Sequence, residues 1–151
     1  MSNLQVLVAE DDRVTADILS FNLRRRGLNF EVCSDGQLAW ERLQDVRPKL
    51  LMTDHQMPRM NGLDLIERIR EMEETPGALP IFLCSAKGLE IDRHYIEENL
   101  NVSKIIFKPF SPRQVLRWID EVLQADIEPP VASSPPVTTV AGANVDMQRL
   151  L

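Results

Sequence analysis

Four short apolar runs in this chain each end beside side chains that could take part in chemistry. The runs and the groups that follow them are residues 5–9 with Glu10 and Asp11, residues 50–53 with Asp54, residues 81–84 with Ser85, and residues 105–107 with Lys108. Clustered carboxylates repel one another unless a cation lies among them, and ligands made only of oxygen favour Mg²⁺. An ammonium group and a hydroxyl facing that cluster suit an oxyanion such as a phosphoryl group. The residue types therefore predict a site where phosphate is placed on a carboxylate.

The elements that must bring these groups together are the strands of a parallel sheet. Short apolar runs between helical patterns are typical of strands whose two faces are both covered. Strand and helix signals alternate along the whole apolar part of the chain, which indicates βαβ units. Ligands bind beyond the carboxyl ends of parallel strands, so side chains far apart in the sequence should converge in one pocket.

The helices between these strands are marked by apolar periodicity and by end signals. The first carries apolar side chains at helical spacing, as a core face does, at Val14, Ile18, Leu19 and Leu23. Asp12 is expected to cap this helix, and the basic run 24–26 followed by Gly27 is expected to end it. The other expected helices span residues 36–43, about 63–72, about 90–99 and 112–123.

In this order and at these intervals, the four patches resemble the receiver domain of two-component response regulators. The matching segments are residues 6–12, 53–62, 85–86 and 108–110, and the resemblance extends from about Leu4 to Leu123. It implies a flavodoxin-like α/β fold, a doubly wound five-stranded parallel sheet of order 2-1-3-4-5 with five helices. It also implies a regulator similar to those of chemotaxis, which takes a phosphoryl group from a sensor histidine kinase or a histidine phosphotransfer protein.

The resemblance assigns the acceptor and the metal ligands to particular residues. Asp54 is implied to be the phosphoacceptor, and Glu10 and Asp11 the acidic pair that binds Mg²⁺ with it. Gln56 is implied to add its backbone carbonyl to the metal. The family more often has Asp at position 10, and the longer Glu10 is expected to reach the metal through water.

Three more residues are implied to surround the phosphoryl group. Ser85 would supply the switch hydroxyl, the small Ala86 would leave room for the phosphodonor, and Lys108 would pair with phosphate. In the family, the peptide bond between this lysine and the following proline, here Pro109, is cis. These assignments follow from the register of the match.

The chain departs from the family at two places that bear on signalling. Ile105 stands where the family usually has Tyr or Phe, the aromatic switch that faces the output surface of the fourth helix, fifth strand and fifth helix. A downstream protein partner is expected at that surface. Gln56 and Lys87 are expected to flank the path of an attacking water and so to tune dephosphorylation.

Charge and composition exclude other classes of partner. The chain has 17 basic and 23 acidic residues, a net charge of −6, and no basic block, which argues against binding of nucleic acid or a membrane surface. No apolar run approaches the roughly 20 residues of a membrane span. The start of the chain lacks the features of a signal peptide, so a cytoplasmic location is expected.

The composition also predicts the domain organisation. Residues 1–125 are expected to form the receiver domain, and residues 126–151, rich in proline, a disordered tail or linker. Cys33 and Cys84 fall in predicted strands and are expected to be buried free thiols. His55 and His94 lie far apart, and exposed positions are expected for both.

Other functions account for the chain less well. A phosphohydrolase of the haloacid dehalogenase type needs a second Asp where Gln56 stands, so the chain is not expected to be an enzyme. A DNA-binding regulator would need an output domain, and nothing after Leu123 has that length or charge. The alternative that stays open, because of Ile105, is an atypical receiver that acts as a phosphate sink or as a binding adaptor independent of phosphorylation.

Overall fold

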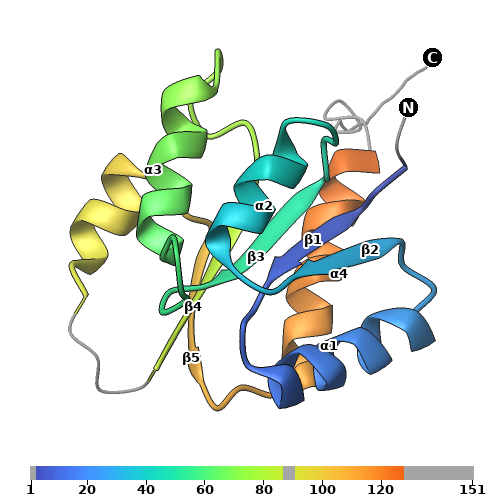
Figure 1. Ribbon diagram of the computed structural model, residues 1–151. Coiled ribbons are helices and arrows are strands. Elements are labelled where there is room, and N and C mark those ends of the chain that lie inside the picture. The colour runs from blue at the N-terminus through green and yellow to red at the C-terminus, as the bar shows by residue number, and fades with distance from the viewer. Residues whose placement is uncertain (1–2, 87–90, 128–151) are drawn as a thin grey trace, which may run out of the picture.

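The computed structural model describes residues 3–86 and 91–127 of the 151-residue chain, which form one parallel sheet between two layers of helices (Figure 1). The strands are β1 (Val6–Ala9), β2 (Phe30–Cys33), β3 (Leu50–Asp54), β4 (Ile81–Ala86) and β5 (Lys104–Lys108). The helices are α1 (Arg13–Arg25), α2 (Gly36–Leu43), α3 (Gly62–Met72), the single π-helical turn η1 (Tyr95–Asn99) and α4 (Pro112–Ile127). All paired strands are parallel, in the order β2-β1-β3-β4-β5. The doubly wound, flavodoxin-like fold expected from the resemblance is confirmed.

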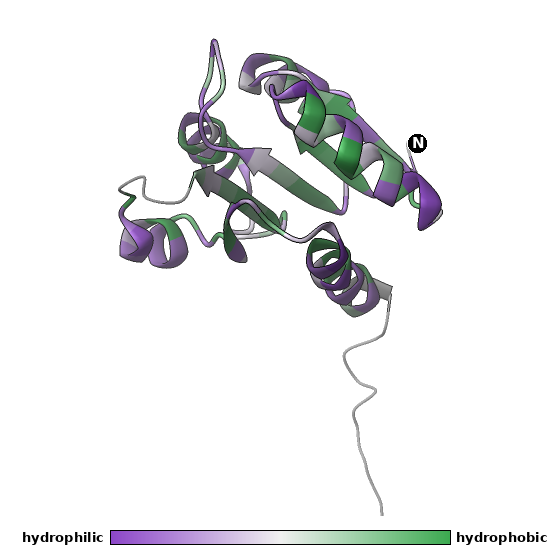
Figure 2. Ribbon diagram, turned by 90° about the horizontal axis from the view of Figure 1, so that it is seen from below, coloured by the Kyte–Doolittle hydropathy of each residue, from purple (hydrophilic) through white to green (hydrophobic). Residues whose placement is uncertain are grey.

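Each face of the sheet has its own apolar core, because successive side chains of a strand point to opposite faces. In β1, Val6 and Val8 pack with residues of α1 and α4, whereas Leu7 and Ala9 pack with residues of α2, α3 and η1. The hydropathy colouring shows hydrophobic strands lying between helices that are hydrophilic on part of their surface (Figure 2). Since both faces are covered, the strands appear in the sequence as unbroken apolar runs.

Side-chain caps begin the helices that follow the site strands. Asp12, Asp35 and Asn61 each accept a hydrogen bond from the backbone amide three residues later, over 2.9, 2.8 and 2.9 Å, and they cap α1, α2 and α3. At its other end α1 stops before Gly27, whose φ of +79° is one that glycine adopts readily. The expected cap at Asp12 and the expected stop at Gly27 are both confirmed.

Three of the strands extend further than the apolar runs indicated. Asp54 is the last residue of β3, Ser85 lies inside β4, and Lys108 is the last residue of β5. The sheet pairing continues past the apolar residues, with Asp54 opposite Cys84 and Ser85 opposite Phe107. These functional side chains are therefore anchored in the sheet and do not lie in the loops beyond it.

Two expectations about the helices are corrected. Val14 and Ile18 of α1 are 65% and 45% exposed, because α1 packs on the sheet through Leu19 and Leu23 on its other side. The fourth helix was expected from about residue 90, but residues 91 and 92 are not helical, and the helical segment spans residues 93–99, of which η1 (Tyr95–Asn99) is the π-helical part. In addition, α4 continues to Ile127, two residues past the expected domain boundary at 125.

The remaining expectations about burial have mixed outcomes. Both cysteines are free thiols, with Cys84 buried and Cys33 half-buried. His94 is exposed as expected, but His55 is only partly exposed and its Nδ1 atom is buried.

In the described part of the chain, no helix has the length and apolar character needed to cross a membrane. Lys87 and nearly all of the segment 126–151 lie outside the described residues.

Candidate functional site

Three carboxylates meet beyond the carboxyl ends of β1 and β3. Glu10 directly follows β1, Asp11 comes next, and Asp54 ends β3, which lies beside β1 in the sheet. One ligand oxygen from each of the three lies within 4.8 Å of the others. Glu10 and Asp54 are 4% and 8% exposed, and Asp11 is open to solvent. The structure thus brings together the three acidic side chains that the sequence placed in one pocket.

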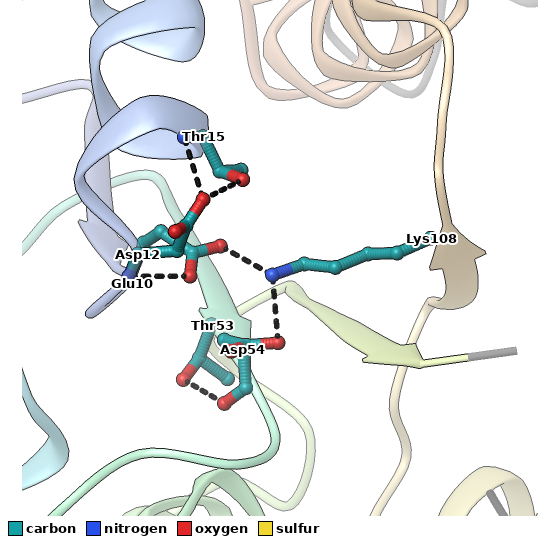
Figure 3. A network of polar contacts seen from close by, with 6 residues as sticks. All are labelled: Glu10, Asp12, Thr15, Thr53, Asp54 and Lys108. Carbon is teal, nitrogen blue, oxygen red and sulfur yellow. Dashed lines mark hydrogen bonds and ion pairs between the residues drawn. The ribbon is translucent and has the colours of Figure 1, made fainter.

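Lys108 reaches this cluster from β5, the strand at the edge of the sheet. Its Nζ atom donates to Oε1 of Glu10 over 2.9 Å and lies 3.3 Å from Oδ1 of Asp54 (Figure 3). The other carboxylate oxygen of Glu10 accepts the backbone amide of Asp12 over 3.1 Å. The peptide bond between Lys108 and Pro109 is cis, as the resemblance implied.

The residues that the structure describes do not balance the charges of the cluster. Burial raises the pKa of both Glu10 and Asp54 above the ordinary carboxyl range, and the hydrogen bonds and charge of Lys108 offset only part of this rise. Burial alone would lower the pKa of Lys108, but its hydrogen bond to Glu10 and the charge of Asp54 outweigh burial and raise that pKa. The ammonium therefore stays charged, and one positive group faces three carboxylates. Oxygen ligands with this excess of negative charge fit a hard divalent cation such as Mg²⁺.

A buried hydroxyl on β4 has its hydrogen-bonding capacity free. The side chain of Ser85 is 1% exposed, and its Oγ atom has no hydrogen-bond partner among the residues that the structure describes. Buried polar atoms nearly always have partners, so the Oγ atom of Ser85 has the capacity to bind a water or a ligand atom. Ala86, the next residue, is exposed and adds no bulk beyond its methyl group.

Close backbone contacts hold the start of the loop between β3 and α3. The amide of His55 donates to the carbonyl of Cys84 over 2.8 Å, and the amide of Gly62 donates back to the carbonyl of His55 over 2.7 Å. A Cβ atom at Gly62 would overlap the carbonyl oxygen of Asp54, so only glycine fits there. The hydroxyl of Thr53 donates to that same carbonyl over 2.9 Å. Asp54 therefore has a fixed backbone from which its carboxylate projects.

The other residues expected at the site are placed as follows. Gln56 lies in the β3–α3 loop with its side chain exposed, two residues beyond Asp54. Ile105 is half-buried and packs against the core beneath α2, α3 and η1. Lys87 lies outside the described residues, so its expected place beside the site is untested.

One ion pair that involves the loop after Asp54 was not found from the sequence. Arg59 of the β3–α3 loop forms an ion pair with Asp35, the cap of α2, over 3.0 Å. The two residues are far apart in the chain, and although Arg59 lies within the matching segment 53–62, nothing in that segment pointed to Asp35 as its partner. The only local signal was the cap position of Asp35 before Gly36.

Comparison with known proteins places most of the chain in one family. A family model described as "Response regulator receiver domain" matches residues 6–120. The alkaline phosphatase synthesis transcriptional regulatory protein PhoP of Bacillus subtilis is 28% identical over 122 residues, which cover 81% of this chain and 49% of PhoP. The chain therefore spans about half the length of that relative.

Solved structures share the fold along almost their whole length. A response regulator receiver protein from Pseudomonas putida is 26% identical, with a TM-score of 0.70 over 80% of this chain and 98% of that one. The receiver domain of a sensor histidine kinase from Pseudomonas aeruginosa, described with a magnesium ion in its active site cleft, is 22% identical. Its TM-score is also 0.70, over 82% of this chain and 99% of that one.

Proposed function

We infer the function of this chain from the premise that it belongs to the response regulator receiver domain family. It is a receiver domain of two-component signalling, and we propose that Asp54 accepts a phosphoryl group from a phosphohistidine. The donor would be a sensor histidine kinase or a histidine phosphotransfer protein. The observation that carries this proposal is the convergence of Glu10, Asp11 and Asp54 within 4.8 Å, with Lys108 in contact with two of them.

The proposed transfer forms one bond and breaks one. An Oδ atom of Asp54 attacks phosphorus, the phosphorus–nitrogen bond of the donor breaks, and its electron pair returns to the imidazole. Mg²⁺, held by Glu10, Asp11, Asp54 and the carbonyl of Gln56, would neutralise the negative charge that builds on the phosphoryl oxygens. Lys108 keeps its proton and can pair with one of those oxygens.

The unpartnered hydroxyl of Ser85 supports a role in sensing the product. Once Asp54 carries a phosphoryl group, the Oγ atom of Ser85 can donate a hydrogen bond that it lacks within the described part of the unmodified chain. The bond would draw β4 toward the phosphoryl group. We propose that this movement alters the surface of η1, β5 and α4, where a downstream protein partner binds.

The surface of α1 supports docking of the phosphodonor. Val14, Ile18 and Phe21 are 65%, 45% and 56% exposed, and their spacing places them along one side of the helix. A row of exposed apolar side chains on a charged surface marks a protein contact. Because α1 begins immediately after Glu10 and Asp11, a donor helix packed on this row would bring its phosphohistidine close to Asp54.

A second function is favoured by Ile105. This side chain packs against the core and has no group that could form a hydrogen bond to report its position. Its β-branched side chain also has stiff rotamers. A receiver that is phosphorylated without a change at its output surface would act as a phosphate sink or as an adaptor independent of phosphorylation.

Phosphorylation by a small-molecule phosphodonor tests the proposal directly. The intact mass of the chain, incubated with acetyl phosphate and Mg²⁺, should rise by one phosphoryl group. Asp54→Asn keeps the shape of the side chain and removes the nucleophile, so its mass should stay unchanged. Labelling of this variant to the same extent as the parent would refute Asp54 as the acceptor.

Amide chemical shifts then separate the two functions. In a switching receiver, phosphorylation should move the resonances of β5 and α4 as well as those near Asp54. In a phosphate sink or adaptor, the shifts should stay confined to the ends of β1, β3 and β4. Ile105→Tyr offers the matched comparison, because it restores the aromatic type that the family has at this position.

A further inference from the structure

The loop that follows Asp54 is tied to the start of α2 by one carboxylate. Arg59 donates from Nε to Oδ2 of Asp35 over 3.0 Å, and from its NH2 nitrogen to Oδ1 over 3.4 Å. Oδ1 of Asp35 also accepts the amide of Leu38 over 2.8 Å and so caps α2. Asp35 is 7% exposed, and the hydrogen bonds from Leu38 and Arg59 hold its pKa below the usual range despite burial. A single charged group therefore joins helix and loop.

Close packing of two backbones also holds the β3–α3 loop against the start of α2. A Cβ atom at Gly36, the first residue of α2, would overlap the carbonyl oxygen of Met60, so the two backbones touch. Arg59 has a φ of +69°, in the left-handed region that residues with a Cβ rarely adopt. Such a conformation persists only where surrounding contacts impose it, and it tends to occur where a loop must hold a functional geometry.

The tied loop is the one that carries the proposed backbone ligand. Asp54, the last residue of β3, directly precedes it, Gln56 lies two residues after Asp54, and Arg59 lies three residues beyond Gln56. The Asp54 end is fixed by the contacts of His55 and Gly62 described above. The Gln56 carbonyl lies between these contacts and Arg59, so a shift of the Arg59 end can turn it.

We propose that Asp35 and Arg59 are positioning residues that hold the Gln56 carbonyl toward the acidic cluster and thereby set its affinity for Mg²⁺. This inference rests on the proposed function, since it concerns the same metal site. A pair with only a structural role would stabilise the fold and leave Mg²⁺ binding unchanged. The two roles therefore differ in a quantity that can be measured.

Substitutions in the full chain can remove the ion pair without removing the cap. Asp35→Asn keeps a side-chain oxygen for the Leu38 amide, because Asn caps helices as well as Asp does, and it loses the charge that attracts Arg59. Arg59→Ala removes the other partner. The dissociation constant of Mg²⁺, from amide shifts during titration, should rise about two- to fivefold in each variant, as expected for a partly exposed pair. The double variant should lose no more than either single one.

The chain offers a matched control on the same helix. Arg42 of α2 forms a two-point ion pair with Glu31 of β2, over 2.6 and 2.9 Å, so this pair joins α2 to a strand and not to the β3–α3 loop. Glu31→Gln should therefore leave Mg²⁺ affinity unchanged. Saturating Mg²⁺ should restore the phosphorylation rate of Asp35→Asn, since only affinity is altered.

The outcomes separate this inference from the function on which it rests. If the parent binds Mg²⁺ and Asp35→Asn binds it equally well, the positioning role is refuted and the proposed function stands. If Glu31→Gln weakens binding as much as Asp35→Asn does, the effect is general to α2 and the positioning role is also refuted. If the parent binds no Mg²⁺, the proposed metal site fails, and the positioning role fails with it.

Discussion

Two buried ionic clusters at opposite ends of the sheet differ in how completely the protein satisfies them. At the end where β4 and β5 begin, Arg70 and Glu73 of the α3 region have side chains only 9% and 10% exposed. Arg70 donates to Glu73 over 2.6 Å and to the carbonyls of Leu100 and Asn101 over 2.7 and 3.1 Å. Glu73 also accepts two backbone amides of the loop before β4. One positive and one negative group are thus paired, and each also forms hydrogen bonds to the backbone of a neighbouring loop.

The cluster at the other end is incomplete in both charge and hydrogen bonding. Three carboxylates face one ammonium, and the hydroxyl of Ser85 lacks a partner within the described residues. Under the proposed function, the closed cluster serves structure and the open cluster serves phosphotransfer. Arg70 and Glu73 complete each other and join α3 to two loops, whereas Glu10, Asp11 and Asp54 leave room for a cation and an anion from outside.

The largest expected effect on stability comes from opening the complete cluster. Glu73→Ala leaves the buried guanidinium of Arg70 without its counter-charge and two loop amides without an acceptor. Removing one partner of a buried pair costs about 3–5 kcal/mol. Urea unfolding of Glu73→Ala and the parent should show this loss of unfolding free energy. A loss as small as that of an exposed ion pair would contradict the distinction between the two clusters.

The next effect in size comes from completing the open cluster with metal. Mg²⁺ that binds only the folded chain should raise the unfolding free energy by about 2.7 kcal/mol at a hundred times its dissociation constant. Asp11→Ala should lose more of this gain than Glu10→Ala, because Glu10 is already engaged by Lys108 and by the amide of Asp12. Thermal melts with and without Mg²⁺ test this order. Equal gains for Asp11→Ala and the parent would refute Asp11 as a ligand.

The sequence predicted the open cluster better than the closed one, for a physical reason. The residues of the open cluster each follow an apolar run, and the ends of neighbouring parallel strands must meet, so the adjacency of β1 and β3 brings Glu10 and Asp54 together. Lys108 lies on β5, which β4 separates from β3, and its long side chain reaches across to the two carboxylates. Arg70 and Glu73 have the i,i+3 spacing of ordinary exposed helix pairs. Nothing in the local sequence shows that the loops before β4 and β5 cover them.

Other discrepancies have the same origin in tertiary packing. Val14 and Ile18 have the spacing of a core face, but the apolar stripe of α1 is wider than its contact with the sheet, and Leu19 and Leu23 occupy that contact. The strand ends extended past the apolar runs because backbone pairing does not depend on side-chain polarity. Asp35 and Arg59 meet only because the β3–α3 loop folds back onto α2.

A smaller effect is expected when the open cluster loses one of its charges in the absence of Mg²⁺. Asp54→Asn removes a buried carboxylate that lies close to two others, and it leaves Lys108 paired with Glu10. We expect the unfolding free energy to rise, because burial already disfavours the charged form of Asp54, and to rise by less than the gain expected from Mg²⁺. Chemical unfolding in EDTA measures it. A clear loss of stability would show that the cluster is balanced without metal, as Arg70 and Glu73 are.

The smallest effect is a dependence on pH that should differ between parent and Asp54→Asn. Burial raises the pKa of Asp54 in the folded chain above its unfolded value, so the folded state binds this proton more tightly. Without Mg²⁺, the contribution of Asp54 to stability should therefore fall as pH rises from the unfolded toward the folded pKa, and stay constant above it. Asp12 and Glu31 have lowered pKa values and act in the opposite direction, since their contributions are lost as pH falls.

Subtracting the unfolding free energy of Asp54→Asn from that of the parent at each pH removes the contributions that both chains share. In EDTA, the unfolding free energy of the parent should rise relative to that of Asp54→Asn as pH is lowered. Saturating Mg²⁺ should reverse that trend, because the metal binds only the ionised carboxylate. A difference that is flat in EDTA would mean that Asp54 ionises as freely in the folded chain as in the unfolded one, and the open cluster would then need no cation to balance it.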